Sequence, residues 1–285
     1  MSFFELQSTG ISAAVFLSAY AIFFIFATAL VFKRGFRTMF TYLWVYSMIR
    51  IASQACGIAF AHTPNLTNLL IAYMVLNTQG FLTLIYASFR ATVHEQRLKF
   101  GVSWFDTREL IQGVRFKFLS SAFALTRLIL LAGSIVAIVG GVEMAGASPT
   151  DPNFSGEVKL SRDLRIAGSV LLLVGTLILI FLAIFAFTQE HIRTVPLKLV
   201  NVAAPFFLVR CVYNFLAIFV THMNFFNFEN YLGSDNRTLV LSESVMSTLM
   251  EFIICLLMTA AFLTTVHAHN TSESNRDSGD EKYDA

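Results

Sequence analysis

Three charged residues stand inside segments that are otherwise apolar enough to lie in lipid: Arg50, Arg210 and Glu251. A charge at the centre of a bilayer costs roughly 3 kcal/mol or more, so such a side chain faces the protein interior and has a partner. Glu251, in the last apolar segment, is the best counter-ion that the chain offers. We therefore predict that Glu251 meets Arg210, Arg50 or both.

The depths of these three residues are compatible with contact. Arg50 and Arg210 each lie eleven residues beyond the expected inner end of their segment, near Met39 and Leu199. At the α-helical rise of about 1.5 Å per residue, both reach roughly 16 Å into the membrane. Glu251 lies roughly 22 Å from the inner end of its own segment. Long side chains can close the remaining difference of about 6 Å.

Such a cluster supports two interpretations. If two arginines share one glutamate, the remaining positive charge could hold a small anionic group, such as a carboxylate or a lipid phosphate. Alternatively, the charges form a structural ion pair that fixes the packing of three helices. The polar residues expected to hydrogen-bond within the cluster are Gln54, Asn77, Gln79, Tyr213 and Asn214.

Pro205 precedes Arg210 by five residues in the same segment. A proline inside a helix removes one backbone hydrogen bond and commonly produces a kink. A packing role is one interpretation, and a hinge for an open-to-closed transition is the other.

The composition excludes several classes of protein. The chain has 285 residues, of which 56% are hydrophobic and only 13% are charged, whereas soluble domains carry about 25% charged residues. The net charge of +2 and the scattered basic residues predict no nucleic-acid partner. The three cysteines lie in apolar segments and the six histidines form no ligand pattern. We therefore expect no loop disulfide, no metal site and no cofactor.

Seven apolar runs are long enough to cross a membrane, since a helical span needs about 20 residues. A backbone in hydrocarbon must satisfy its own hydrogen bonds, so each run should be an α-helix. The sequence therefore predicts an all-α integral membrane protein with a seven-helix bundle over residues 11–267. A short outer terminus (1–10) precedes it, and a disordered cytoplasmic tail (268–285) rich in Ser, Asp and Glu follows. The spans are about 11–32, 39–61, 69–92, 119–141, 164–188, 199–221 and 241–267.

Basic residues predict the orientation, because Lys and Arg concentrate in cytoplasmic connections. The connections after the first, third and fifth spans are richer in them than those on the opposite side. We therefore expect the N-terminus outside and the C-terminus in the cytoplasm, in the plasma membrane or an endomembrane. The acceptor triplets at Asn65, Asn153 and Asn236 all fall on the expected outer side, which predicts a glycoprotein.

The sequence resembles a family of fungal seven-helix membrane proteins defined only as a domain of unknown function. The resemblance rests on the run from Phe32 to Phe60 with Arg50, on Pro205…Val209-Arg210…Tyr213, and on Met250-Glu251-Phe252. A looser likeness in layout exists to the fungal lipid-translocating exporters. The first resemblance implies a seven-helix fold, and neither implies an established activity.

Three functions compete. A receptor-like protein or sensor would bind a small anionic or lipidic ligand and act on a cytoplasmic signalling partner. A transporter or lipid translocator would need a continuous polar pathway through the arginines. A membrane-embedded enzyme of secondary metabolism would use Glu251 as a proton donor, but the neighbouring arginines favour the ionised carboxylate. We rank the three in this order, and the lipid bilayer is the partner common to all.

Overall fold

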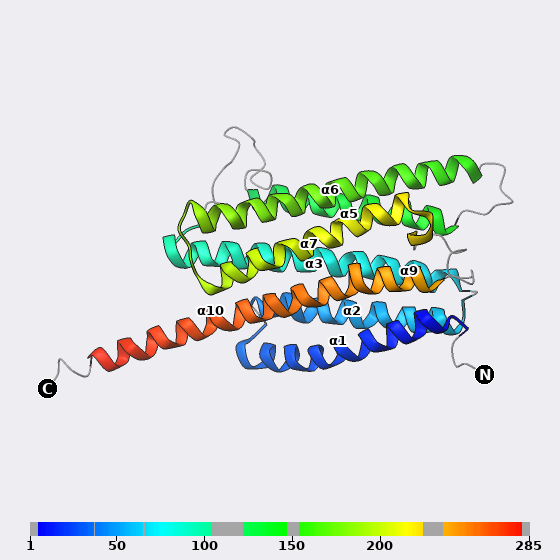
Figure 1. The fold of residues 1–285 in the computed structure, drawn as a ribbon. Helices are drawn as coiled ribbons and strands as arrows, with labels where there is room; N and C mark the ends of the chain where they lie inside the picture. Colours follow the sequence, from blue (N-terminus) through cyan, green and yellow to red (C-terminus); the bar gives the residue numbers. More distant parts are fainter. Residues whose placement is uncertain are drawn as a thin grey trace.

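Seven helices long and apolar enough to cross a membrane form the structure, and the described ranges contain no strand. The computed structural model describes residues 5–36, 38–64, 66–103, 122–146, 154–224 and 236–280. The seven spans predicted from the apolar runs are therefore confirmed as helices (Figure 1). Their bounds are α1 Gln7–Arg34, α2 Phe40–His62, α3 Thr67–Phe100, α5 Ala122–Gly146, α6 Phe154–Thr188 and α7 Val195–Phe219, followed by α9 Asn236–Glu243, η2 Ser244–Leu249 and α10 Met250–Asp280 as one continuous seventh span.

Several helices extend beyond the apolar runs that predicted them. Helix α3 continues to Phe100, and α6 begins at Phe154. Lys159 and Arg162 therefore lie on a helix, although they fall between the predicted spans 119–141 and 164–188. An apolar run marks only the part of a helix inside hydrocarbon, whereas the backbone stays helical until a residue ends it. Likewise, α10 runs to Asp280 beyond the rest of the bundle, although we expected disorder from residue 268 (Figure 1).

The outer faces of the bundle carry large apolar side chains. Ile22, Ile25 and Phe32 on α1 are each at least 70% exposed, and Phe181 on α6 is 65% exposed. Water-soluble proteins do not expose apolar side chains on this scale along whole helices. These faces therefore suit contact with lipid tails.

The closest helix packing joins α5 to α6 and depends on glycines. A Cβ atom added at Gly168 would lie 2.6 Å from the backbone nitrogen of Ala137, and one added at Gly140 would lie 2.8 Å from the carbonyl of Ser161. The Ser161 hydroxyl also donates to the Gly140 carbonyl over 2.6 Å. Small residues let the backbones of membrane helices approach each other closely. In lipid, dispersion and hydrogen bonds hold helices together, because the hydrophobic effect does not drive their association there.

Helix α10 occupies the position that brings the charged segments together. It packs along α7 and also contacts α2 and α3, while α7 contacts α3. In Figure 1, α10 runs between α7 on one side and α2 with α1 on the other. Residues that point inward from the middle of α2, from α7 and from the start of α10 therefore share one region of the interior.

Candidate functional site

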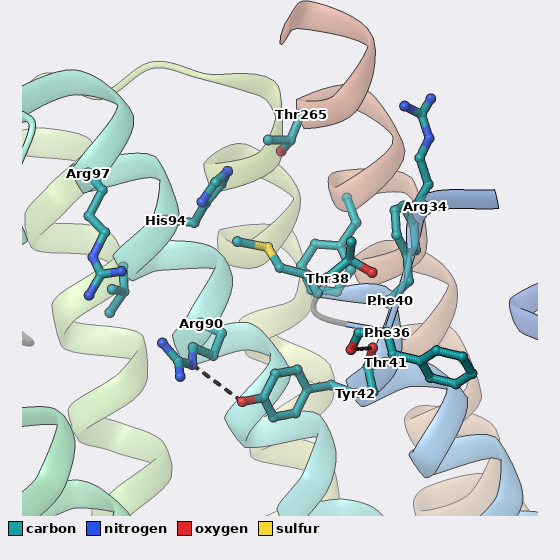
Figure 2. A pocket seen from close by; sticks show the side chains of 13 residues that line it. Arg34, Phe36, Thr38, Phe40, Thr41, Tyr42, Arg90, His94, Arg97 and Thr265 are labelled. Carbon is teal, nitrogen blue, oxygen red and sulfur yellow. Dashed lines mark hydrogen bonds between the residues drawn. The ribbon is translucent and has the colours of Figure 1, made fainter. Parts of the chain in front are cut away.

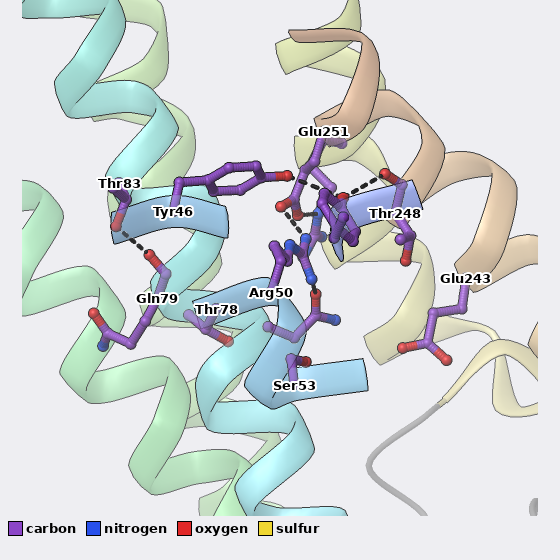
Figure 3. A network of polar contacts seen from close by, with 12 residues as sticks. Tyr46, Arg50, Ser53, Thr78, Gln79, Thr83, Glu243, Thr248 and Glu251 are labelled. Carbon is purple, nitrogen blue, oxygen red and sulfur yellow. Dashed lines mark hydrogen bonds and ion pairs between the residues drawn. The ribbon is translucent and has the colours of Figure 1, made fainter. Parts of the chain in front are cut away.

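Glu251 lies between Arg50 and Arg210 and binds both. Its Oε1 accepts a hydrogen bond from Nε of Arg210 over 2.7 Å, and its Oε2 accepts one from Nη2 of Arg50. Arg50 and Glu251 are 0% exposed and Arg210 is 2% exposed. Figure 3 shows the guanidinium group of Arg50 directed at the carboxylate. These charge-assisted bonds are the strongest class of hydrogen bond in proteins, and a dry interior strengthens them further.

An amide holds the other side of each guanidinium group. Nη1 of Arg50 donates to Oδ1 of Asn77 on α3, and Nη1 of Arg210 donates to Oδ1 of Asn214, one turn further along α7. We call Arg50, Asn77, Arg210, Asn214 and Glu251 the charge cluster. It draws side chains from α2, α3, α7 and α10, so it links four of the seven spans.

Aromatic rings enclose the two arginines. The Cζ atom of Arg50 lies 5.9 Å from the ring centres of both Tyr20 and Tyr46. The Cζ atom of Arg210 lies 5.2 Å from the ring centre of Phe81 and 5.8 Å from that of Tyr213. Cations are attracted to ring faces, and the attraction grows when both groups are desolvated. The rings therefore offset part of the cost of burying two guanidinium groups.

Gly80 on α3 gives Arg50 room to reach its partners. A Cβ atom added at Gly80 would lie 3.0 Å from Nε of Arg50 and 3.4 Å from its Cζ. Because Arg50 is held by Asn77 at one end and Glu251 at the other, it has little freedom to move away. The glycine therefore belongs to the site, although it contributes no side chain.

A second buried carboxylate, Glu243, lies near the charge cluster. It is 5% exposed, and its Oε1 accepts a hydrogen bond from the Tyr73 hydroxyl over 2.7 Å. It is also within electrostatic reach of Arg210 and Arg50. Glu243 was not among the residues predicted for the cluster, and two arginines sharing one glutamate would carry an excess positive charge. With Glu243 nearby, two buried carboxylates stand against the guanidinium groups of Arg50 and Arg210.

The π-helical turn η2 explains how both glutamates face inward. In a regular α-helix, residues eight positions apart differ by about 80° around the axis. A π-helical turn is wider and absorbs an extra residue, so Glu243 and Glu251 stay on one side of the span. The Tyr20 hydroxyl donates to the Thr248 carbonyl in this turn over 3.3 Å, and the hydroxyls of Ser12 and Ser244 lie 2.5 Å apart. Helix α1 therefore supports the irregular turn.

The other predicted hydrogen-bonding residues divide into two groups. Gln54 is 2% exposed and lies on α2, but its Nε2 has no acceptor among the described residues. Tyr213 contributes its ring to the enclosure of Arg210. Gln79 points away from the cluster, because its Nε2 donates to the Ser134 hydroxyl on α5 over 3.0 Å. The structure thus keeps Gln54 and Tyr213 near the site and places Gln79 at the α3–α5 contact.

The remaining predicted residues lie elsewhere. Pro205 is exposed on the face of α7, and the helix continues past it from Val195 to Phe219. Of the three glycosylation candidates, Asn65 and Asn153 lie outside the described residues, and Asn236 is the first residue of α9. The hinge and the modification of these asparagines stay predictions.

Sequence reasoning missed six residues of the site: Tyr20, Tyr46, Tyr73, Gly80, Phe81 and Glu243. A signal existed for Tyr46, which precedes Arg50 by four positions and so shares its helix face. Regular α-helical spacing gave no such signal for Glu243, which lies eight positions before Glu251. For Tyr20 and Tyr73, which come from other helices, the sequence holds no local signal.

The space around the charge cluster is small. A cavity of about 30 Å³ is lined by Arg210 and Asn214 together with Arg165 of α6. That volume holds about one or two water molecules and no organic ligand. Within the part of the chain that the structure describes, no group of His, Cys, Asp and Glu could hold a metal ion. The geometry therefore describes a closed ion-pair network that ties helices together.

The fold and this site define a multi-pass helical membrane protein with a buried charge network. The family described as a domain of unknown function, DUF7702, matches residues 7–268, and the chain belongs to that family. Comparison with curated proteins and with solved structures gives no match in either case. The family likeness expected from the sequence is confirmed at this level, while fungal origin and the likeness to lipid exporters stay predictions.

Proposed function

We propose that this protein is a receptor-like membrane sensor in which the charge cluster locks one arrangement of α2, α3, α7 and α10. In this proposal the N-terminus lies outside, and a ligand acts by shifting the balance between the locked arrangement and a second one. We propose this locking role for the charge cluster and not the ligand-binding role predicted from the sequence, because the cavity beside Arg210 and Asn214 is only about 30 Å³.

The observation that carries the proposal is the position of two irregular elements beside the lock. Pro205, which has no N–H to donate, lies inside α7 five residues before Arg210, and η2 ends just before Glu251. π-Helical turns and proline sites are where helices bend and where functional motions concentrate. The two charges of the Arg210–Glu251 pair thus sit on the two spans best able to change shape.

The proposal is tested by measuring helix positions when the lock is weakened. Spin labels at Lys198 on α7 and Leu98 on α3, both exposed, report the separation of these helices by pulsed electron paramagnetic resonance. The 285-residue chain is held in lipid nanodiscs, with its three cysteines replaced by alanine. Glu251→Gln keeps the side-chain size and removes the charge, so we expect the distance distribution to gain a second population.

Two further variants make the result specific. Asn214→Leu removes the amide that holds Arg210 and should shift the same distances in the same direction. Gln79→Ala breaks the bond to Ser134 between α3 and α5 without touching the charge cluster, and should leave them unchanged. If every folded variant shows the same distance distribution as the unaltered protein, the lock is ruled out.

A lipid translocator is the second candidate, supported by a cavity of about 680 Å³ at the end of the bundle formed by the α1–α2 turn and the last turns of α3. A cavity that opens at one end of the bundle is what a transporter shows in one of its states. Proteoliposomes with a fluorescent phospholipid in both leaflets separate the two candidates. Transfer of the label between leaflets that Glu251→Gln abolishes would favour the translocator, and no transfer above protein-free vesicles favours the sensor.

A further inference from the structure

The large cavity lies at one end of the bundle, away from the charge cluster. It has a volume of about 680 Å³ and is bounded by the end of α1, the start of α2, the last turns of α3, and α10 (Figure 2). Its floor is apolar: the rings of Phe40 and Phe262 are buried there, with their centres 5.9 Å apart. Its walls are basic.

Helix α3 supplies one basic wall. Arg90, His94 and Arg97 are spaced by four and three residues, which places them on one face of the helix. All three line the cavity, and Figure 2 shows them on the same side of it. Arg34, at the end of α1, stands on the other side. Three guanidinium groups and an imidazole therefore border one space.

The cavity lining contains no acidic residue among the residues that the structure describes. Glu95, which follows His94 on α3, is not part of the lining: it is 4% exposed and accepts a hydrogen bond from the Thr265 hydroxyl. Hydroxyl groups add further polar contacts. The Tyr42 hydroxyl accepts a bond from Nε of Arg90 over 3.4 Å, which leaves its own hydrogen to be donated.

Both walls are held in place. Gly101, with φ of 74°, ends α3, and its N–H donates a hydrogen bond to the Arg97 carbonyl. Nζ of Lys99 donates to the carbonyls of Glu190 and His191 in the α6–α7 connection. On the other wall, the Thr38 hydroxyl donates to the Gly35 carbonyl over 2.9 Å. The arginines therefore project from anchored backbone, which lowers the entropy cost of binding.

We infer that this cavity binds a phosphate monoester group at the membrane surface, as the headgroup of an anionic lipid presents it. A phosphate monoester carries up to two negative charges and three acceptor oxygens, which two arginine forks can bind in bidentate fashion. Basic pockets between membrane helices at the lipid headgroup level bind such lipids. The inference depends only on the membrane location of the bundle, so it is independent of the proposed lock.

The test uses the full chain in nanodiscs of phosphatidylcholine alone, with phosphatidic acid, or with phosphatidylglycerol. Phosphatidic acid carries a phosphate monoester, while phosphatidylglycerol carries only a diester. We expect phosphatidic acid to raise the melting temperature more than phosphatidylglycerol does. Joint replacement Arg90→Ala and Arg97→Ala should remove that rise and weaken retention of phosphatidic acid about tenfold or more, measured by native mass spectrometry.

Matched variants separate the site from general surface charge. The pair Arg193→Ala and Lys198→Ala removes two exposed positive charges at the same end without touching the cavity, and should behave as the unaltered protein. The pair Arg90→Lys and Arg97→Lys keeps the charge but loses the bidentate fork, so it should bind at an intermediate level. If the double alanine variant melts early in phosphatidylcholine alone, Arg34→Ala against Lys33→Ala tests the opposite wall.

Two results would overturn the inference: equal effects of phosphatidic acid and phosphatidylglycerol, or equal losses in the cavity and control pairs. Soluble glycerol phosphate distinguishes the source of the ligand. If it displaces phosphatidic acid at millimolar concentration, the site accepts free phosphate compounds as well. If it does not, the phosphate must be presented on acyl chains.

Discussion

Glu251 is bound by two guanidinium groups in a part of the protein that water does not reach. Removing one partner of a buried ion pair costs more than the pair itself contributes, because the remaining charge stays in a medium that cannot solvate it. At this site the loss of the Glu251 carboxylate leaves Arg50 and Arg210 without the counter-ion that both bind directly, and Glu243 is the one buried carboxylate that the structure describes near them. Tyr20, Tyr46 and Phe81 offset only part of that cost.

Glu251→Gln should therefore lower the free energy of unfolding by about 3–5 kcal/mol. Thermal unfolding in detergent micelles, followed by circular dichroism, measures the effect. Glu243→Gln is the matched control, because a glutamine oxygen still accepts the Tyr73 hydrogen bond. This variant should lower the free energy of unfolding by about 1 kcal/mol. Equal losses for the two variants would contradict the central place that we give to Glu251.

At the scale of the helix, η2 is the feature that sequence periodicity could not predict. Regular α-helical spacing places Glu243 about 80° from the face of Glu251, and Glu243 was not among the residues predicted for the charge cluster. The π-helical turn absorbs one residue and is supported from α1 by Tyr20 and Ser12. The extra residue in this turn brings the side chains of Glu243 and Glu251 onto the same side of the span.

Deleting Val245, which is 41% exposed within η2, should convert the turn to regular α-helix and keep both glutamates facing inward. We expect a loss of about 1 kcal/mol from the Tyr20 contact, measured by thermal unfolding. Deleting Leu256, which is 47% exposed within α10, instead rotates one half of the helix against the other by about 100°. That variant should not accumulate as a folded protein, and its stability at wild-type level would refute this account of η2.

The contact between α5 and α6 gives a second test at this scale. Gly168→Leu forces a side chain into the backbone of Ala137 and should cost about 3 kcal/mol, the upper end of overpacking effects. Ala167→Leu adds the same side chain one residue away on the exposed face and should change stability little. Thermal unfolding of both proteins in nanodiscs compares them. A larger loss of stability for Ala167→Leu than for Gly168→Leu would contradict the importance that we give to the close contact between α5 and α6.

At the scale of the whole molecule, composition predicts more than any single residue does. The seven spans follow from apolar runs, because hydrocarbon permits only helices or closed barrels. Arg50, Arg210 and Glu251 could be singled out because charges are rare in such runs. Tyr20 and Tyr73 could not, since a tyrosine in a membrane helix is ordinary and its partner depends on tertiary packing. The large basic cavity was also missed, because Arg34 and Arg90 come from helices whose contact the sequence does not specify.

Orientation is a prediction at the same scale. Arg193→Cys, in the α6–α7 connection, and Lys159→Cys, near the start of α6, place thiols at opposite ends of α6. In sealed right-side-out membrane vesicles, a membrane-impermeant maleimide should label the cysteine at position 159 directly. It should label the one at position 193 only after permeabilisation. The reverse pattern would place the N-terminus in the cytoplasm.

Arg50 and Glu251 are separated by 201 positions along the chain, and this separation bears on biosynthesis. A ribosome delivers the second span long before the last one. Until the final span arrives, both arginines must be shielded by amides, rings and the machinery that integrates nascent helices. The last helix therefore brings the carboxylate that neutralises the two buried arginines. Chains that end before this helix would keep two buried positive charges without a counter-ion, which cellular quality control would recognise.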